Sequence, residues 1–178
     1  RLSGKPLKIT NPFSAVKQGL ALVPEERRKE GILVEDPVYA NLSATSLDKY
    51  SKKFSFIDKN AEKAAAKEII ADLGIKTPSE NQLVKLLSGG NQQKVVVAKA
   101  LSQEMKVVIM DEPTAALTER ETDTLFHMMR QLKSRGVAIV YISHRMEEVF
   151  TECDTVTVMR DGHTIITKPI GETDVDEV

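Results

Sequence analysis

The chain has 178 residues, and its 25 Lys and Arg against 26 Asp and Glu give a formal net charge of −1. This length suits one domain with a real core, and the balanced charge does not favour nucleic acid or an anionic membrane surface as a partner. Hydrophobic residues make up 41% and charged residues 29%, a composition that excludes extended disorder. The longest apolar runs fall far short of the roughly 20 residues that span a bilayer. The chain opens on RLSGKPLKIT, without a methionine, and we expect it to be a piece of a longer protein.

The first 40 residues combine a short helix, a strand and a charged loop. The segment 11–18, NPFSAVKQ, predicts a brief helix, and the apolar run within 19–26 predicts a buried strand that Pro24 ends. The charged stretch that follows predicts an exposed loop. Its basic cluster, Arg27 to Lys29, is interleaved with glutamates and is therefore interpreted as a solvated surface.

Helical patterns dominate the next part of the chain. Residues 41–74 predict helix most clearly in DKNAEKAAAKEIIADLG, which has helix-favouring alanines and a closing glycine. Either Asp58 or Asn60 can cap this helix. A second helix is predicted over 89–102, with Ser88 as its N-cap.

The remaining chain alternates strands with helices. KVVIMDE, at 106–112, predicts a central parallel strand buried on both faces, and VAIVYIS, at 137–143, repeats that pattern. Between them, a Thr118–Glu121 capping box predicts the start of a helix. The later run TVTVMRDGHTIIT contains an Asp161–Gly162 turn and predicts a hairpin. This alternation indicates an α/β fold with a largely parallel sheet and a helical segment between its first and later strands.

Two carboxylates follow the predicted central strand. Asp111 and Glu112 would lie at the carboxyl end of a parallel strand, where such sheets bind ligands. The first acid suits Mg²⁺, which takes one or two carboxylates beside substrate phosphates and keeps several waters. Glu112 could then polarise an attacking water as a general base. An acidic pair in this place can equally well begin a turn.

A glycine pair opens the second predicted helix, and a histidine follows a predicted strand. At Ser88, Gly89 and Gly90, the missing side chains let an anion approach unpaired amides at a helix N-terminus. The same letters also describe a glycine-rich turn that starts a helix. His144 would share a sheet edge with Glu112, where an imidazole can contact a terminal phosphate or the attacking water. A lone histidine there can also be an ordinary loop residue.

Three separated motifs carry a family resemblance. LSGGNQQ, VVIMDEPTAAL and YISHRMEEV, in this order and spacing, resemble those of the ATP-binding cassette (ABC) ATPases, especially the cassette subunits of sugar-type importers. The resemblance covers almost the whole chain. It implies a P-loop NTPase-like (RecA-like) parallel core with an inserted α-helical subdomain, without the N-terminal part of the cassette. Residues 1–40 would then be a core remnant with the glutamine-loop region, 41–98 the helical subdomain and 99–178 the returning core.

The resemblance also implies roles for individual residues. Asp111 matches the magnesium-associated acid, Glu112 the catalytic base and His144 the switch histidine. The family's signature stretch closes over ATP held by the opposite cassette of a dimer. The residues that match this stretch here are Ser88, Gly89, Gly90, Asn91 and Gln92.

The chain departs from the family pattern at three places. No G-x-x-x-x-G-K-[ST] sequence occurs in it, and that loop with its lysine grips the phosphates in the family. We therefore expect the isolated chain to bind ATP weakly or not at all. Glu25 stands where the family usually has a glutamine, and an acid there could still face magnesium. Thr118 stands where the interface loop usually ends in aspartate, and it doubles as a helix cap.

The function implied by the resemblance is ATP hydrolysis that drives import of sugars or similar small solutes. The implied cofactors are ATP and Mg²⁺. The implied partners are a second cassette in a dimer or tandem, transmembrane permease subunits and, indirectly, a periplasmic or extracellular solute-binding protein, with no nucleic acid. The implied location is the cytoplasmic face of the cell membrane. Two alternatives remain open: a catalytically inactive module that contacts a cassette or permease, and a non-transport ABC ATPase acting on DNA or ribosomes.

Overall fold

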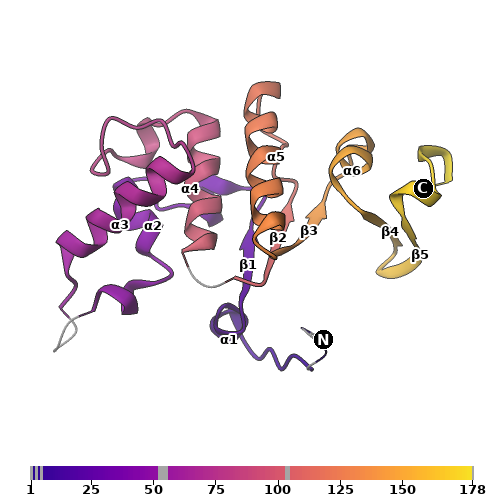
Figure 1. Ribbon diagram of the computed structural model, residues 1–178, viewed down its shortest axis with the longest axis horizontal. Helices are drawn as coiled ribbons and strands as arrows, with labels where there is room; N and C mark the ends of the chain where they lie inside the picture. The colour runs from indigo at the N-terminus through magenta and orange to yellow at the C-terminus, as the bar shows by residue number, and fades with distance from the viewer. Residues whose placement is uncertain (1, 3, 5, 52–55, 103–104, 178) are drawn as a thin grey trace.

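A computed structural model describes residues 2, 4, 6–51, 56–102 and 105–177. The described chain forms a three-stranded sheet, a group of helices beside it and a separate two-stranded hairpin (Figure 1). None of the helices in these ranges combines the length and apolar character that crossing a bilayer requires.

The sheet is parallel and has the strand order β1-β2-β3, with β1 at Leu20–Val23, β2 at Val107–Asp111 and β3 at Ala138–Ile142. Val23 lies opposite Met110 in the register of the first pair. Because β2 is hydrogen-bonded on both sides, its side chains at alternate positions reach the centre of the core. The predicted central strand and parallel α/β sheet are confirmed.

The core occupies one face of this sheet. Val23, Val108 and Met110 are fully buried and join a cluster that includes residues of α4 (Gly89–Leu101) and α5 (Glu119–Ser134). The opposite face is open in the described chain, where the exposed apolar side chains are those of Leu22, Val140 and Ile142. The prediction that the strands are buried on both faces was therefore wrong for β3, and only alternate residues of β2 are buried. A run of apolar letters cannot distinguish a strand covered on both faces from one covered on one.

The helices are grouped around the sheet (Figure 1), and α3, α4 and α5 begin at the predicted caps. Besides α4 and α5, they are α1 (Pro12–Lys17), α2 (Val38–Ser43) and α3 (Lys59–Asp72). Asp58 is the N-cap of α3, because its carboxylate accepts hydrogen bonds from the backbone amides of Asn60 and Ala61. Gly74 follows α3 with a φ of +56°, a left-handed conformation that glycine adopts without strain. Short helical turns, mostly of the 3-10 type, complete the group: η1 (Arg27–Gly31), η2 (Leu47–Tyr50) and η4 (Val84–Leu86).

The charged segment after β1 is more ordered than predicted. Residues of η1 form one helical turn that packs on α4, and a Cβ at Gly31 would lie only 3.0 Å from a methyl carbon of Val96. Arg28 donates from Nε to Oε1 of Gln92 at 3.2 Å. The interpretation of this basic cluster as a solvated surface was therefore wrong for Arg27, which is half-buried. Arg28 and Lys29 are exposed as predicted, although Arg28 also bonds to Gln92 and Lys29 pairs with Glu26.

The C-terminal part contains α6 (Met146–Glu152) and the hairpin of β4 (Thr155–Arg160) with β5 (His163–Pro169), followed by the turns η5 (Ile170–Glu172) and η6 (Val175–Glu177). Asp161 and Gly162 form the turn with φ values of 52° and 78°. Two successive residues with positive φ are typical of a tight hairpin turn, so this prediction is confirmed. The hairpin lies at the far end of the molecule from α3 (Figure 1).

The burial of Met110 predicts a large stability effect. Met110→Ala removes a fully buried side chain from β2, and it should lower the free energy of unfolding by roughly 2–5 kcal/mol. Met159→Ala is the matched control, because Met159 is 64% exposed on β4, and its effect should stay within about 0.5 kcal/mol. Urea unfolding followed by circular dichroism measures both. Equal effects of the two variants would contradict this assignment of the core.

Candidate functional site

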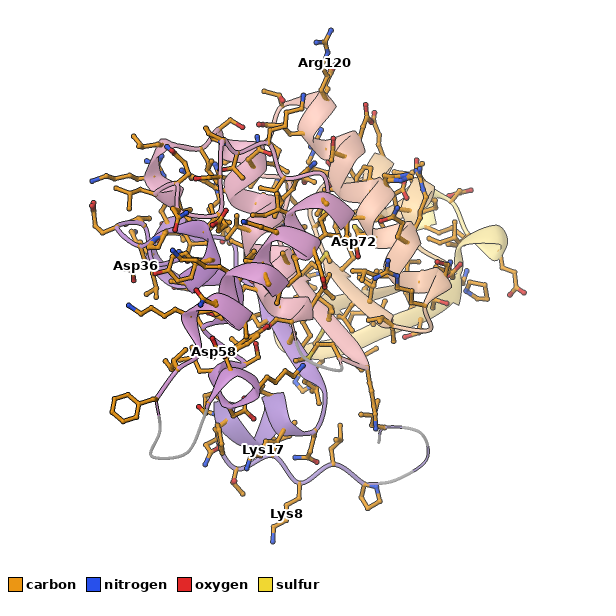
Figure 2. The ribbon with its side chains drawn as sticks, turned by 60° about the vertical axis from the view of Figure 1, so that its left-hand side comes forward. Lys8, Lys17, Asp36, Asp58, Asp72 and Arg120 are labelled. Carbon is orange, nitrogen blue, oxygen red and sulfur yellow. The ribbon has the colours of Figure 1, made fainter. Side chains whose placement is uncertain are left out.

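The predicted site residues gather at the carboxyl edge of the parallel sheet. Glu25 lies two residues beyond the end of β1, and His144 lies two residues beyond β3. Asp111 ends β2, and Glu112 follows it directly. The N-terminus of α5 is at this end of the molecule, where Figure 2 shows Arg120 at the tip of the helix and Lys17 at the opposite end.

Glu112 and His144 are in direct contact. Oε1 of Glu112 accepts hydrogen bonds from the backbone amide of His144 at 3.0 Å and lies 2.8 Å from its ring Nδ1. An ionised carboxylate can only accept, so this contact assigns the proton of a neutral imidazole to Nδ1 and leaves Nε2 as an acceptor. The His144 side chain is 76% exposed, whereas that of Glu112 is 18% exposed. The imidazole therefore faces outward above a half-buried carboxylate.

The second carboxylate oxygen of Glu112 is a buried acceptor. Oε2 has no hydrogen-bond partner among the described residues. A buried unpaired oxygen carries a substantial desolvation cost, and such groups concentrate at functional sites. Because Oε1 is held by His144, Oε2 is the carboxylate oxygen of Glu112 that remains without a partner in the described chain.

The backbone of Glu112 has an uncommon conformation that places this carboxylate. Its φ is 41°, in the left-handed region that residues with a Cβ rarely adopt. The Glu112 amide donates to the carbonyl oxygen of Ile142 at 3.0 Å, which extends the pairing of β2 with β3 by one bond. That bond holds the chain while it reverses direction after β2. The reversal turns the side chain of Glu112 toward His144 and away from the strand.

The same end of β2 can accommodate Mg²⁺. Asp111 is half-buried at the last position of the strand, next to Glu112. In the described ranges, no group of three or more His, Cys, Asp or Glu side chains forms a dedicated metal cage. Mg²⁺ bound with phosphates does not need one, because it takes one or two carboxylates and keeps several waters. The donors present therefore fit Mg²⁺ bound mainly through water and phosphate.

The signature stretch, residues 88–92, begins α4. Ser88 is the N-cap, and its Oγ accepts from the backbone amide of Asn91 at 3.4 Å and from Asn91 Nδ2 at 2.9 Å. The predicted helix and its cap are confirmed. Ser88 itself is exposed, so its hydroxyl remains accessible to a ligand while it caps the helix.

The amide of Gly90 already binds a carboxylate. It donates to Oε1 of Glu121 at 2.6 Å, while Oε2 of the same side chain accepts from the amide of Thr118 at 3.2 Å and closes the predicted capping box. A Cβ on Gly90 would lie 2.4 Å from Glu121 atoms, so this contact requires glycine there. The hydrogen bond from the Thr118 amide is the largest cause that lowers the pKa of Glu121, and the Gly90 amide and the charge of Arg27 add to it.

Sequence reasoning found the capping box but missed the contact between Gly90 and Glu121, because nothing in the sequence relates residues 31 positions apart.

Gln92 also differs from the other signature residues. It is fully buried, and its amide nitrogen donates to the carbonyl oxygens of Val84 and Leu87 at 3.2 Å each. With its oxygen held by Arg28, Gln92 has no exposed atom for a nucleotide and instead fixes η1 and η4 against α4.

Comparison with known proteins connects this arrangement to one family. Residues 2–115 match the family described as ABC transporter. The chain belongs to the ABC transporter family. It is 46% identical to the ribose import ATP-binding protein RbsA of Bacillus licheniformis over 177 residues, 99% of this chain and 35% of that protein. It is 38% identical to the arabinose import ATP-binding protein AraG of Pectobacterium atrosepticum over 161 residues, 90% of this chain and 32% of that protein.

Solved structures of ABC proteins share the fold. The ADP conformation of MJ1267, an ATP-binding cassette of an ABC transporter, matches with a TM-score of 0.70 at 24% identity over 90% of this chain and 64% of that one. CbiO1 from Clostridium perfringens, part of the ABC transporter complex cbiONQ, matches with a TM-score of 0.74 at 22% identity over 96% of this chain and 65% of that one. The chain thus spans about a third of the curated ABC relatives and somewhat under two thirds of these structures.

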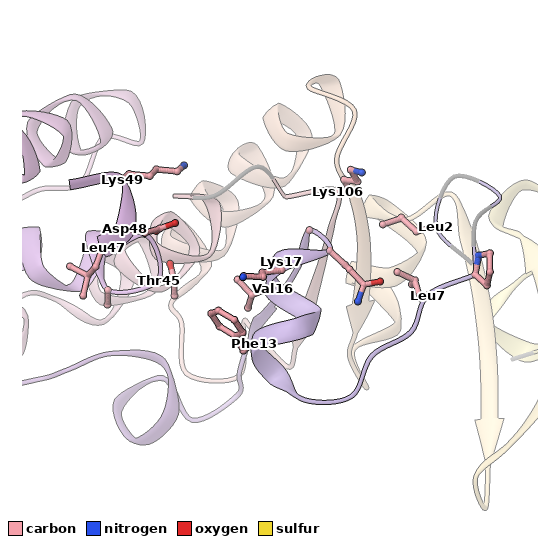
Figure 3. Close-up of a pocket in the computed structure, with 14 residues that line it drawn as sticks. Leu2, Leu7, Phe13, Val16, Lys17, Thr45, Leu47, Asp48, Lys49 and Lys106 are labelled. Carbon is pink, nitrogen blue, oxygen red and sulfur yellow. The ribbon is translucent and has the colours of Figure 1, made fainter. Parts of the chain in front are cut away.

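A groove at the other end of the sheet lies away from these ABC motif residues. It has a volume of about 1200 Å³, and its lining includes Phe13, Lys17, Lys49 and Lys106 (Figure 3). Lys106 directly precedes β2, so the groove opens at the amino edge of the sheet. Parallel sheets of this type bind nucleotides at the carboxyl edge. The groove is therefore not part of the candidate site.

The ionised Glu121 carboxylate should stabilise the ABC fold in a pH-dependent way. Because its folded pKa lies below the usual 4.5, its contribution is present above pH 4.5 and is lost as the pH falls through the lowered pKa. Glu121→Gln should lower the free energy of unfolding by about 1 kcal/mol near neutral pH. The difference from the unmodified chain should shrink toward acidic pH.

Urea unfolding between neutral and acidic pH measures this dependence. Glu119→Gln is the control, because Glu119 is exposed at the same end of α5. A difference for Glu121→Gln that stays constant across this range would show that the ionised carboxylate is not the stabilising group.

Proposed function

We propose that this chain contributes ATP hydrolysis to an ABC assembly that imports sugars or similar small solutes. The observation that carries the proposal is the buried, unpaired Oε2 of Glu112 beside His144 at the carboxyl edge of the sheet. Relatives named as ribose and arabinose import ATP-binding proteins support the class of solute. The charge balance and the motif set give no support to a nucleic-acid partner.

In this proposal, three residues at the strand ends share the chemistry. Oε2 of Glu112 accepts the proton of the attacking water, while the contact of Oε1 with His144 holds the carboxylate in place. The exposed side chain of His144 contacts the terminal phosphate by donating from Nε2 when both ring nitrogens carry a proton, with Nδ1 still donating to Glu112. Asp111 would hold Mg²⁺, which would supply positive charge to neutralise the phosphates. Glu25, exposed near the same edge, contributes a further carboxylate toward the metal.

The signature stretch serves a different nucleotide from the one beside Glu112. Among the described residues, the contacts of Glu112 with His144 and those of Gly90 with Glu121 form two separate clusters. We assign Ser88, Gly89 and Gly90, with Asn91 beside them, to ATP held by a second cassette. A phosphate that reaches the Gly90 amide must displace the Glu121 carboxylate, since one amide hydrogen serves one strong acceptor at a time.

The remaining assignments follow from the same proposal. Residues 1–40 and 99–178 belong to the cassette core and 41–98 to its helical subdomain. The partners are a second cassette and transmembrane permease subunits, with a solute-binding protein acting indirectly. The chain then works at the cytoplasmic face of the membrane.

Glu112→Gln tests the assignment of the base. In the ATP-hydrolysing assembly that contains this chain, the variant should lower turnover at the Glu112 site by roughly 10²–10⁴-fold, because an amide cannot take the proton. ATP binding should persist, since the amide keeps the shape of the side chain. Asp123→Asn, an exposed change on α5, is the control. Steady-state phosphate release and nucleotide binding measure the two quantities, and undiminished turnover would remove Glu112 from this role.

Calorimetric titration of the isolated chain with MgATP tests the expectation that it does not grip ATP alone. The chain contains no G-x-x-x-x-G-K-[ST] sequence, so heats attributable to tight binding should be absent. Tight binding would overturn this expectation. Mixing the chain with an intact cassette gives the complementary result: association that requires ATP supports the role of the signature stretch, and association that ignores ATP favours the inactive interaction module.

A further inference from the structure

Glu148 is a buried carboxylate to which the proposed hydrolysis assigns no role. It lies on α6, four residues after His144, and only 6% of its surface is exposed. The neighbouring Glu147 on the same helix points into solvent. Burying a carboxylate is costly unless its oxygens are hydrogen-bonded or paired with a charge. The contacts of Glu148 therefore show what its burial achieves.

Both oxygens of Glu148 have defined neighbours. Oε2 accepts hydrogen bonds from Oγ1 of Thr114 at 2.8 Å and from the hydroxyl of Tyr141 at 2.5 Å. Oε1 forms an ion pair with Arg145, which lies close to it without hydrogen-bond geometry. Burial, and then the hydrogen bond to Glu148, raise the pKa of Tyr141, so its hydroxyl keeps its proton and donates it to this contact. Thr114 is itself almost fully buried.

These contacts join the two segments that carry the candidate catalytic pair. Thr114 lies two residues after Glu112, in the loop that leaves β2, and Tyr141 lies in β3 three residues before His144. Glu148 thus connects the loop after the base to the strand before the histidine, from a helix that follows both. The left-handed conformation of Glu112 needs such support, because strained backbone persists only where the surroundings fix it.

We propose that Glu148 is a positioning residue that sets the geometry of the Glu112–His144 pair through Thr114 and Tyr141. Its expected consequence for hydrolysis rests on the proposed function, whereas its effect on the pair itself does not. A misplacement of about 1 Å in a reacting group can lower a rate by roughly 10²-fold. A carboxylate that only stabilised α6 would leave the Glu112–His144 contact unchanged when altered.

The first measurement concerns the pair in the isolated chain. The backbone amide of His144 donates to Glu112 from an otherwise exposed residue, so its hydrogen exchange by NMR reports that contact. In Glu148→Gln, exchange at this amide should accelerate by about tenfold or more while amides of the core keep their protection. Thr114→Val removes only one hydroxyl donor and should produce the same change. Thr114→Ser and Glu147→Gln should leave the amide unchanged.

The second measurement concerns turnover in the ATP-hydrolysing assembly. Glu148→Gln and Thr114→Val should each lower kcat by roughly 10–100-fold with KM for ATP within about twofold. The double variant should be no worse than the more severe single one, because both act through one contact. Thr114→Ser should retain turnover.

The two measurements separate the possible failures. An unchanged His144 amide in a folded Thr114→Val or Glu148→Gln chain overturns the positioning role. If Glu148→Gln does not fold, Thr114→Val alone decides. An assembly with no hydrolysis in its unmodified form overturns the proposed function but leaves the exchange result, and hence the positioning role, standing.

Discussion

The turn at Glu112 is the constraint on which the candidate site depends. A residue with a Cβ adopts a φ of 41° here, at the point where the central strand ends, and a backbone hydrogen bond to Ile142 keeps the turn in register with β3. Without that reversal, the carboxylate would continue the alternation of β2 and project from one face of the sheet. With it, one carboxylate oxygen reaches His144 and the other stays buried without a partner. The strain and the unpaired oxygen are both costs, and both fall on the residue whose chemistry the family resemblance emphasises.

The sequence was sufficient to predict the elements whose causes are local. The N-caps Asp58 and Ser88, the capping box at Thr118 and the turn at Asp161 all depend on residues within a few positions of each other, and the structure confirms each of them. The central position of β2 also followed from its apolar run and the alternation of elements. These signals act over one turn of helix or one hairpin, which is the range that a single sequence reports well.

The sequence-based predictions were wrong or missing where residues far apart in the sequence come into contact. The open face of β3 could not be foreseen, because an apolar strand has the same letters whether one or two layers cover it. The anchoring of Arg28 by Gln92 joins residues 64 positions apart, and that of Glu148 by Thr114 joins residues 34 apart. In both cases a polar or charged side chain, Gln92 or Glu148, is buried and connects two separate segments of the chain. The family resemblance placed the motif residues at one edge, but it could not say which of them touch.

Glu121 occupies a backbone amide at the N-terminus of α4 that a phosphate could also bind. The amide of Gly90 attracts an anion because the first amides of α4 have no helical partner, and the Glu121 carboxylate of α5 accepts its hydrogen bond. The same carboxylate caps its own helix through its other oxygen, so its release from Gly90 need not uncap α5. An incoming phosphate would therefore compete with one hydrogen bond rather than with the start of a helix. Glu112 and Glu121 are the first and last residues of one continuous segment of ten residues. This segment includes Thr114, which Glu148 connects to β3, so a shift of Glu121 acts on the same segment. The Glu112–His144 cluster and the Gly90–Glu121 cluster thus have separate contacts, but both depend on the position of the segment 112–121.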